Sequence, residues 1–242
     1  MTRSKAAAAR KVDADLRPLL DGMRCEVAAQ CSFDGIVGAQ SAKSSLRDVI
    51  LFRRPAMRAL RSRLDHASSS NILLYGPPGT GKTMLAKAMV TESQCKYLIN
   101  VRASDVRSKW EGESERFIKN LFLYAQENMP CIVFIDEFDA IAPVRGTGSS
   151  GGTVGQSGAS LVSQLLVTLD GAQGRLPEDI LVLTATNRLD AIDAAIRRRF
   201  SCVEVPLPTL REREQLLLRT LAAHSHCIST PEIKRVAKLM DR

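Results

Sequence analysis

Residues 71–83 read Asn-Ile-Leu-Leu-Tyr-Gly-Pro-Pro-Gly-Thr-Gly-Lys-Thr, and this stretch decides the fold. The short apolar run Ile72–Tyr75 predicts a buried strand, and the apolar residues spaced along 84–89 predict the start of a helix. Between them, residues 76–83 match G-x-x-x-x-G-K-[ST], the pattern of a loop that cradles phosphates. A strand, a glycine-rich loop and a helix in this order are the context in which the pattern binds a nucleotide.

The residue types of this loop suit the chemistry. Glycines let backbone N–H groups approach phosphates closely, and the N-terminus of the following helix adds a favourable dipole. Lys82 offers a positive charge to the β- and γ-phosphates, and Thr83 offers a hydroxyl to Mg²⁺. We therefore predict binding of ATP and Mg²⁺. The nucleotide-binding residues expected here are Gly76, Pro77, Pro78, Gly79, Thr80, Gly81, Lys82, Thr83 and Met84.

A pair of carboxylates follows a second buried strand. The apolar run Cys131–Ile135 ends in Asp136 and Glu137, and ligands bind outside the carboxyl ends of strands in open α/β sheets. This position predicts that Asp136 holds Mg²⁺ through water and that Glu137 activates a water for attack on the γ-phosphate.

Two further polar features follow along the chain. Asn187 comes after the predicted strand Ile180–Ala185, where it can orient a water or the γ-phosphate. The triplet Arg197, Arg198 and Arg199 has two interpretations from charge alone. It is either a solvated helix end or the source of an arginine finger for a neighbouring subunit's nucleotide.

Composition sets wider limits. The 242 residues predict one to two domains, and the net charge of +8 permits acidic partners without choosing among them. Six scattered cysteines without a C-x-x-C pair predict free buried thiols in a reducing compartment, and so a cytoplasmic protein. The absence of H-E-x-x-H excludes a zinc protease of that type, and no apolar run reaches the length of a membrane span.

The remaining segments alternate between strands and helices. Residues 12–30 have helical spacing, interrupted by Pro18. The basic stretch 41–63 has an apolar side and is more often a solvated face than a binding site. The Gly/Ser-rich tract 144–158 is expected to be flexible, either as a mobile loop near the site or as a surface insertion. Strands are expected over 95–101 and 202–205, and helices over 113–128, 159–170, 209–223 and 231–241.

The order of these signals resembles the AAA ATPases, over about residues 12–242. The phosphate loop is followed by Lys-Trp-Glu-Gly-Glu-Ser-Glu, Phe-Ile-Asp-Glu-Phe-Asp, Ala-Thr-Asn-Arg, Ala-Ile-Arg-Arg-Arg-Phe and Val-Pro-Leu-Pro. Within that family the chain is most similar to the meiotic group of katanin, spastin, fidgetin and the vacuolar-sorting ATPase. Segments 108–115 and 127–140 look most like the vacuolar-sorting branch.

The resemblance implies a role for each matched position. By this resemblance, residues 76–83 match the Walker A motif. Residues 132–137 match the Walker B motif, with Glu137 as the catalytic base. The other implied roles are sensor 1 for Asn187, arginine fingers for Arg197 and Arg198, a substrate-gripping pore loop for Lys109 and Trp110, and backbone contact with adenine for Ile36 and Gly38. The family works as ATP-dependent hexamers that thread a polypeptide.

The resemblance also implies the architecture. We expect an α/β fold with a five-stranded parallel sheet covered by helices on both faces. Residues 1–30 would form a basic segment and linker helix, residues 31–207 the large ATPase domain, and residues 208–242 the start of a small helical lid that is cut short. In place of a charged second pore loop the chain has the Gly/Ser tract 146–158.

The function that this reading predicts is Mg²⁺-dependent ATP hydrolysis coupled to remodelling, threading or disassembly of a protein assembly. Lys109–Glu115 carries three acids against one base, so a nucleic-acid motor is disfavoured. The substrate stays open between ESCRT-like filaments and microtubules. The alternative function is a non-hydrolysing, ATP-binding regulator of a full-length partner.

Overall fold

A six-stranded sheet forms the centre of the computed structural model, which describes residues 11–26, 31–57, 71–93, 95–103, 106, 114–144, 154–170, 176–222 and 228–240. The strand order is β1-β3-β4-β5-β2-β6. Five strands are parallel, and β1 runs antiparallel to β3 at one edge. The strands are β1 (Arg24–Glu26), β2 (Ile72–Tyr75), β3 (Tyr97–Arg102), β4 (Cys131–Asp136), β5 (Ile180–Thr186) and β6 (Ser201–Glu204).

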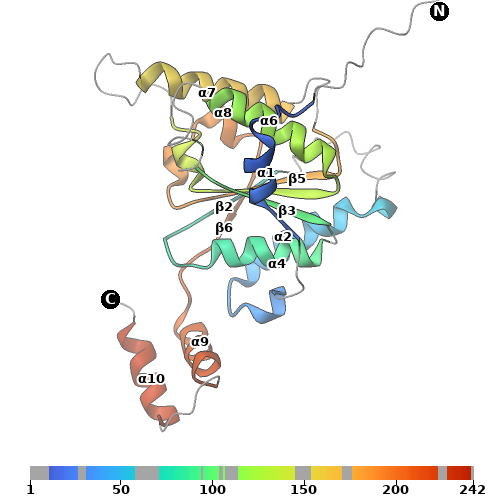
Figure 1. Cartoon of the computed structure of the whole chain (residues 1–242). Helices are drawn as coiled ribbons and strands as arrows, with labels where there is room; N and C mark the ends of the chain where they lie inside the picture. Colours follow the sequence, from blue (N-terminus) through green and yellow to red (C-terminus); the bar gives the residue numbers. More distant parts are fainter. Residues whose placement is uncertain are drawn as a thin grey trace, which may run out of the picture.

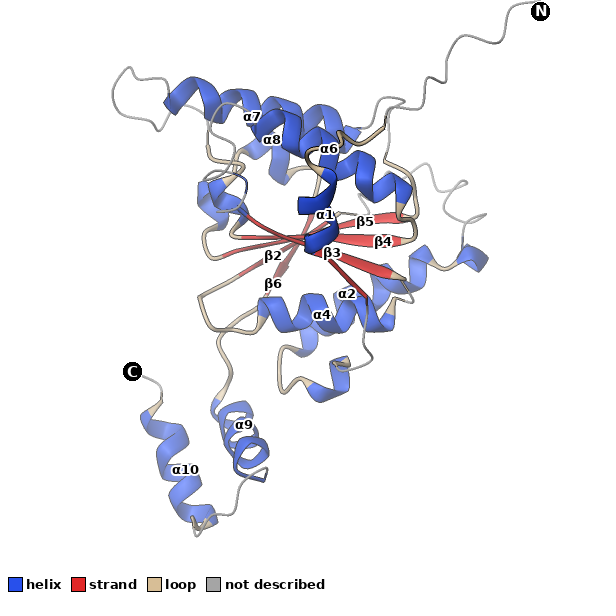
Figure 2. Ribbon diagram, in the orientation of Figure 1, coloured by secondary structure: helices blue, strands red, loops and turns tan. Residues whose placement is uncertain are grey.

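Helices cover both faces of the sheet (Figures 1 and 2). One face carries α1 (Arg17–Met23), α6 (Ser114–Glu127), α7 (Val154–Asp170) and the short α8 (Ala194–Arg197). The other face carries α2 (Gln40–Arg53) and α4 (Lys82–Glu92). The predicted α/β class and its five parallel strands are therefore confirmed, and the sheet has one additional, antiparallel edge strand.

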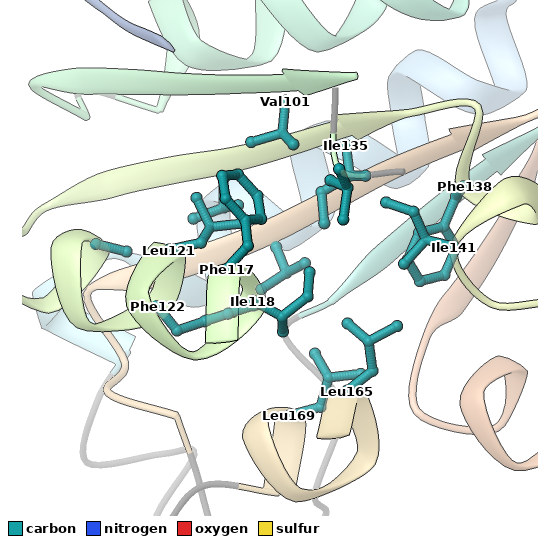
Figure 3. Packing of buried hydrophobic residues seen from close by; sticks show 14 of the residues in the cluster. Val101, Phe117, Ile118, Leu121, Phe122, Ile135, Phe138, Ile141, Leu165 and Leu169 are labelled. Atoms are coloured by element: carbon teal, nitrogen blue, oxygen red, sulfur yellow. The ribbon is translucent and has the colours of Figure 1, made fainter. Parts of the chain in front are cut away.

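Two apolar clusters fill the space between the sheet and these helices. The alternation along β4 shows why, since Val133 and Ile135 belong to the cluster under α6 and α7, whereas Ile132 and Phe134 belong to the opposite one. Figure 3 shows the first cluster, in which side chains from α6, α7 and the strands meet. Burial on both faces explains the continuous apolar runs that the sequence analysis read as strands.

Within the described residues, the helix expected over 12–30 is shorter than predicted at both ends. It runs from Arg17 to Met23, and the chain then forms β1, which pairs Cys25 with Leu98 of β3. Pro18 sits in the first turn of the helix, where its missing N–H costs nothing. The backbone of β3 offers an open edge, and pairing with that edge outweighs the helical spacing of three exposed residues.

The segment ahead of β1 is fastened to α6. The Asp13 carboxylate accepts from Nε of Arg116 at 2.6 Å, and the backbone N–H of Asp13 donates to Asn120 Oδ1 at 2.8 Å. Arg17 pairs with Glu127 at the other end of α6. These contacts, together with Leu16 and Leu20 buried beneath them, make residues 12–26 part of the packed domain.

The tract 144–158 is the second correction. Helix α7 begins at Val154, so its first five residues belong to the stretch that we expected to be flexible. Residues 146–153 lie outside the described residues. The other helices and strands follow the predicted ranges closely, including α6, β5 and β6.

Two helices follow the sheet, α9 (Leu210–Ala222) and α10 (Thr230–Leu239). The turn ahead of α10 is a capping box, in which the Ser229 N–H donates to Glu232 Oε2 at 2.8 Å and Pro231 occupies the first turn. Arg213 Nε of α9 donates to the Ala237 carbonyl of α10 at 3.0 Å, which holds the two helices together. Their ranges match the helices expected over 209–223 and 231–241.

The five described cysteines are all free, as predicted. The expectation that they are buried holds for Cys131 alone, since Cys31 and Cys95 are half-buried and Cys25 and Cys202 are exposed. Among the described helices, none combines the length and apolar character that crossing a membrane requires.

Candidate functional site

The phosphate loop joins the end of β2 to the start of α4. Gly79 and Gly81 both have positive φ, at 77° and 87°, and Gly81 occupies the N-cap position of α4. A Cβ atom added at either glycine would meet no atom within 4 Å, so the backbone at these positions borders open space. Backbone N–H groups in such a turn at a helix N-terminus form a cradle that fits a phosphate. Of the remaining predicted residues, Pro77, Pro78 and Met84 are exposed.

Gly76 fixes the loop against the neighbouring strand. Its φ is 150°, and a Cβ atom there would lie 2.2 Å from the carbonyl oxygen of Val205. The N–H of Val205 donates to the Tyr75 carbonyl at 2.8 Å, so the two backbones run in contact just before the loop. Only a residue without a side chain permits this approach.

Lys82 is held inside the loop. Its side chain is buried, and Nζ donates to the carbonyls of Gly76 at 2.9 Å and Pro77 at 2.8 Å. Burial lowers the pKa of this lysine, and the Asp136 carboxylate acts in the opposite direction. The ammonium group is therefore positioned by the loop itself, within the turn that would receive the phosphates.

The two carboxylates at the end of β4 have different surroundings. Thr83 Oγ1 donates to Asp136 Oδ2 at 3.0 Å, which joins the start of α4 to the end of β4. The other oxygen of Asp136 accepts from the Glu137 N–H at 2.9 Å. Glu137 is exposed and has a left-handed backbone with φ of 54°, which an L-residue seldom adopts. A hydroxyl and a carboxylate side by side are the hard oxygen donors that fit Mg²⁺.

Asn187 lies at the same edge of the sheet. Register pairs Tyr75 with Thr186, so Asn187 follows β5 just where Gly76 follows β2. Because β5 lies between β2 and β4, the phosphate loop, the Asn187 turn and the Asp136–Glu137 pair converge at the carboxyl ends of three adjacent strands. The side chain of Asn187 is exposed.

One contact at this edge was missed by the sequence analysis. Thr186 Oγ1 donates to Asp139 Oδ1 at 2.7 Å and accepts from the Arg188 N–H at 3.0 Å. This pair ties the turn after Glu137 to the turn that carries Asn187. The second acid of Phe-Ile-Asp-Glu-Phe-Asp was a visible signal, but its partner lies 47 residues away and no local pattern identifies it.

The arginine triplet divides into two exposed residues and one anchored residue. Arg197 and Arg198 are exposed, whereas Arg199 forms an ion pair with Asp170 at the end of α7. Within the described part of the chain, the Arg197 side chain makes no hydrogen bond or ion pair, and Arg198 Nε donates to the Ala194 carbonyl at 3.3 Å. The structure therefore leaves the Arg197 and Arg198 side chains facing solvent.

The segment with Ile36 and Gly38 lies against α9. Gly38 has φ of 73°, and a Cβ atom there would approach Glu212 Oε1 to 2.6 Å. Buried Lys43 donates to the Ile36 carbonyl, and Arg219 Nη1 of α9 donates to the Gly35 carbonyl at 2.7 Å. This segment is consequently held between α2 and α9. The two predicted pore-loop residues, Lys109 and Trp110, lie outside the described residues.

Comparison with known proteins identifies the class. The family model for the "ATPase family associated with various cellular activities (AAA)" matches residues 72–207, which is more than half of the chain. The protein therefore belongs to the AAA family of ATPases.

Individual relatives agree with this class. Spastin of Danio rerio is 35% identical over 233 residues, covering 96% of this chain and 40% of that protein. Fidgetin-like protein 1 of Homo sapiens is 33% identical over 211 residues, covering 87% of this chain and 30% of that protein. The protein SUPPRESSOR OF K(+) TRANSPORT GROWTH DEFECT 1 of Arabidopsis thaliana is 37% identical over 202 residues, covering 82% and 44%. The chain thus spans less than half the length of these curated relatives. The predicted similarity to the meiotic group is confirmed.

Solved structures agree with the fold. The crystal structure of the FIGL-1 AAA domain superposes with a TM-score of 0.77 at 29% sequence identity, covering 99% of this chain and 76% of that one. The same domain in complex with ADP gives a TM-score of 0.75, with the same identity and coverage.

Proposed function

We propose that the protein hydrolyses ATP in a Mg²⁺-dependent reaction and uses the energy to remodel a protein assembly. The observation that carries the proposal is the convergence of Lys82, Thr83 and Asp136 at the mouth of the phosphate loop, with Thr83 and Asp136 joined at 3.0 Å. The ADP complex of the related FIGL-1 domain supports the assignment of the nucleotide.

The residues divide the reaction between them. Lys82 and the loop N–H groups hold the phosphates, and Thr83 and Asp136 would hold Mg²⁺, which when bound neutralises charge on the phosphates. Glu137 accepts a proton from the attacking water, and its exposed carboxylate is accessible to that water. Asn187, from the adjacent strand end, orients that water or the γ-phosphate.

The arginines complete the site from another subunit. Arg197 and Arg198 face solvent, so a neighbouring copy could place its own nucleotide against them. An arginine supplied in this way stabilises the charge of the transition state and contributes about 10³–10⁵-fold in related reactions. We therefore propose a ring, in its simplest form a homohexamer, as the active assembly.

The proposed contacts with adenine and with the polypeptide substrate rest on the resemblance to the AAA ATPases. Ile36 and Gly38 would contact the base through their backbone, and Lys109 and Trp110 would grip a polypeptide in the ring. ESCRT-like filaments and microtubules are the two candidate substrates. Pelleting of each polymer with the protein, with and without ATP, distinguishes them.

The test is ATP turnover measured against protein concentration, with Glu137→Gln as the variant. We expect turnover that rises cooperatively with concentration and falls by about 10²–10⁴-fold in Glu137→Gln, while binding of a fluorescent ADP analogue is kept. Glu26→Gln is the matched control, since Glu26 is an exposed glutamate of β1 at the sheet edge farthest from β6. Tight nucleotide binding without turnover at any concentration would contradict hydrolysis and favour a nucleotide-binding regulator.

A further inference from the structure

Three consecutive arginines have different environments in this protein. The Arg199 guanidinium binds the Asp170 carboxylate through two hydrogen bonds, Nε to Oδ1 at 2.6 Å and Nη2 to Oδ2 at 2.7 Å. Its third nitrogen, Nη1, donates to the Ala195 carbonyl at 2.8 Å. Every nitrogen of Arg199 is therefore used within the chain, whereas Arg197 and Arg198 extend into solvent.

The backbone around Arg199 is fixed as well. The Arg199 carbonyl accepts from Asn71 Nδ2 at 3.3 Å, and the next residue but one, Ser201, donates its N–H to the Asn71 carbonyl at 2.9 Å. Phe200 packs its ring against Phe138, at 5.5 Å between centroids, in the turn that follows Glu137. The C-terminal side of the arginine turn is thus attached to Asn71, just ahead of β2, and to Phe138, in the turn that follows Glu137.

The N-terminal side of the turn is capped. Asp193 Oδ1 accepts from the N–H groups of Ala195 at 2.8 Å and Ile196 at 3.3 Å. Helix α8 has only four residues, so its own backbone hydrogen bonds give it little rigidity. Its orientation consequently depends on what holds its two ends, and on the C-terminal side the charged contact is the one between Arg199 and Asp170.

We propose that Asp170 and Arg199 form a positioning pair that aims Arg197 and Arg198 at the nucleotide of a neighbouring subunit. Arg199 is not itself a finger, because its donors are already bound to Asp170 and Ala195. This inference rests on the proposed function, in which an arginine from one copy serves the site of another. It adds Asp170, at the end of α7, to the residues on which that function depends.

Guanidinium geometry explains the requirement for this pair. The planar fork matches a carboxylate in one orientation, so the contact fixes direction as well as distance. The hydrogen bonds between the two side chains lower the pKa of Asp170 and raise the pKa of Arg199, so both groups are charged at neutral pH. A catalytic group displaced by about 1 Å can cost about 100-fold in rate, so a small tilt of α8 matters for the fingers.

The pair contributes little to the free energy of unfolding. A purely structural role and a positioning role therefore predict different results. Its side chains are 33% and 51% exposed, and exposed ion pairs contribute about 0–1 kcal/mol to folding. A purely structural role would therefore leave turnover and nucleotide affinity nearly unchanged. A positioning role would lower turnover selectively.

The experiment compares Asp170→Asn, Arg199→Gln and Arg199→Lys in the full chain, with Arg17→Gln as control. Arg17 forms a similarly exposed ion pair with Glu127, on the α1 side of α6. We expect kcat to fall by about tenfold in Asp170→Asn and Arg199→Gln, with KM and the affinity for a fluorescent ADP analogue within about twofold of wild type. Arg199→Lys keeps the charge but loses the fork, so a smaller loss is expected, and Arg17→Gln should have no effect.

A second measurement does not require turnover. Amide hydrogen exchange at residues 197–200 reports the turn directly, because their N–H groups donate within it to Asp193, Ala194, Ile196 and Arg197. We expect Asp170→Asn to speed this exchange by at least about threefold, with exchange in α4 unchanged. Loss of protection across the whole domain would instead assign the pair a general structural role and overturn the proposal.

Two further outcomes decide the matter. Unchanged kcat in both Asp170→Asn and Arg199→Gln would overturn the proposal, and so would a loss of kcat in Arg199→Gln without any loss in Asp170→Asn. If the wild-type protein binds nucleotide without turnover, the proposed hydrolysis fails. The exchange experiment then tests the proposed role of the Asp170–Arg199 pair without any need for turnover. Unchanged exchange at residues 197–200 would overturn the proposal.

Discussion

Replacing Gly76 with alanine should destabilise the protein more than any other change in the phosphate loop. The added Cβ would lie 2.2 Å from the Val205 carbonyl oxygen, which is about 1 Å closer than van der Waals contact allows. The obstacle is backbone, so no side chain can turn away from it. The strand β6 would have to move from β2, together with the hydrogen bond from Val205 to Tyr75.

The expected loss is the sum of three contributions. A non-glycine residue at φ of 150° costs about 1–3 kcal/mol, and overpacking against a fixed neighbour costs about 1–3 kcal/mol. A weakened ladder hydrogen bond adds about 0.5–1.5 kcal/mol. We therefore expect a loss of about 2.5–7.5 kcal/mol, which is a large part of the 5–15 kcal/mol typical of a domain.

Urea unfolding followed by far-ultraviolet circular dichroism measures this loss, with the slope checked against wild type. Two glycines serve as controls. Gly79→Ala meets no atom and has only the strain of φ at 77°, so about 1–2 kcal/mol is expected. Gly22→Ala, in α1 with open space, should be neutral or stabilising by up to about 1 kcal/mol. A Gly76→Ala protein within about 1 kcal/mol of wild type would refute the reasoning.

Three other outcomes follow from burial and charge. Phe117→Ala should lower the free energy of unfolding by about 3–5 kcal/mol because its ring is fully buried beside α7. Leu51 is exposed, so Leu51→Ala should cost under about 0.5 kcal/mol. Equal losses of the two variants in thermal unfolding would contradict this assignment of the core. Burial raises the pKa of Cys131 to about 12, so iodoacetamide at pH 8 should label exposed Cys25 long before Cys131, and mass spectrometry that finds equal rates would argue against that burial. Because Arg199 lowers the pKa of Asp170, the stabilisation from their pair is present above the usual carboxyl value of 3.8 and is lost as pH falls through the lower, folded value. The small stability advantage of wild type over Asp170→Asn should therefore shrink in acid, and a gap that widens below pH 3.8 would contradict the assignment.

The sequence predicted the phosphate loop and the strand ends around it well, because the residues that determine these features act locally. The run Ile72–Tyr75, the glycines of the loop and Lys82 each act through backbone geometry within a few residues. The same holds for the ends of β4 and β5, since continuous apolar runs identify strands that are buried on both faces.

Long-range pairing set the limit of prediction. Strand β1 has three exposed residues and no alternation, so only its contact with β3 reveals it. The start of α7 falls in a tract with two glycines at 155 and 158, which local propensity disfavours for a helix. Asp139 with Thr186, and Asp170 with Arg199, are partners 47 and 29 residues apart, and nothing within either segment announces the other.

The order of the strands has a practical consequence for fusions. The chain enters the sheet through β1 at one edge and leaves it through β6 at the other, and five strand spacings of about 4.8 Å separate these edges by roughly 24 Å. A fluorescent reporter or an affinity handle joined ahead of Val12 would therefore sit away from α9 and α10. Such a handle could immobilise the protein on a surface while α9 and α10 stay unobstructed.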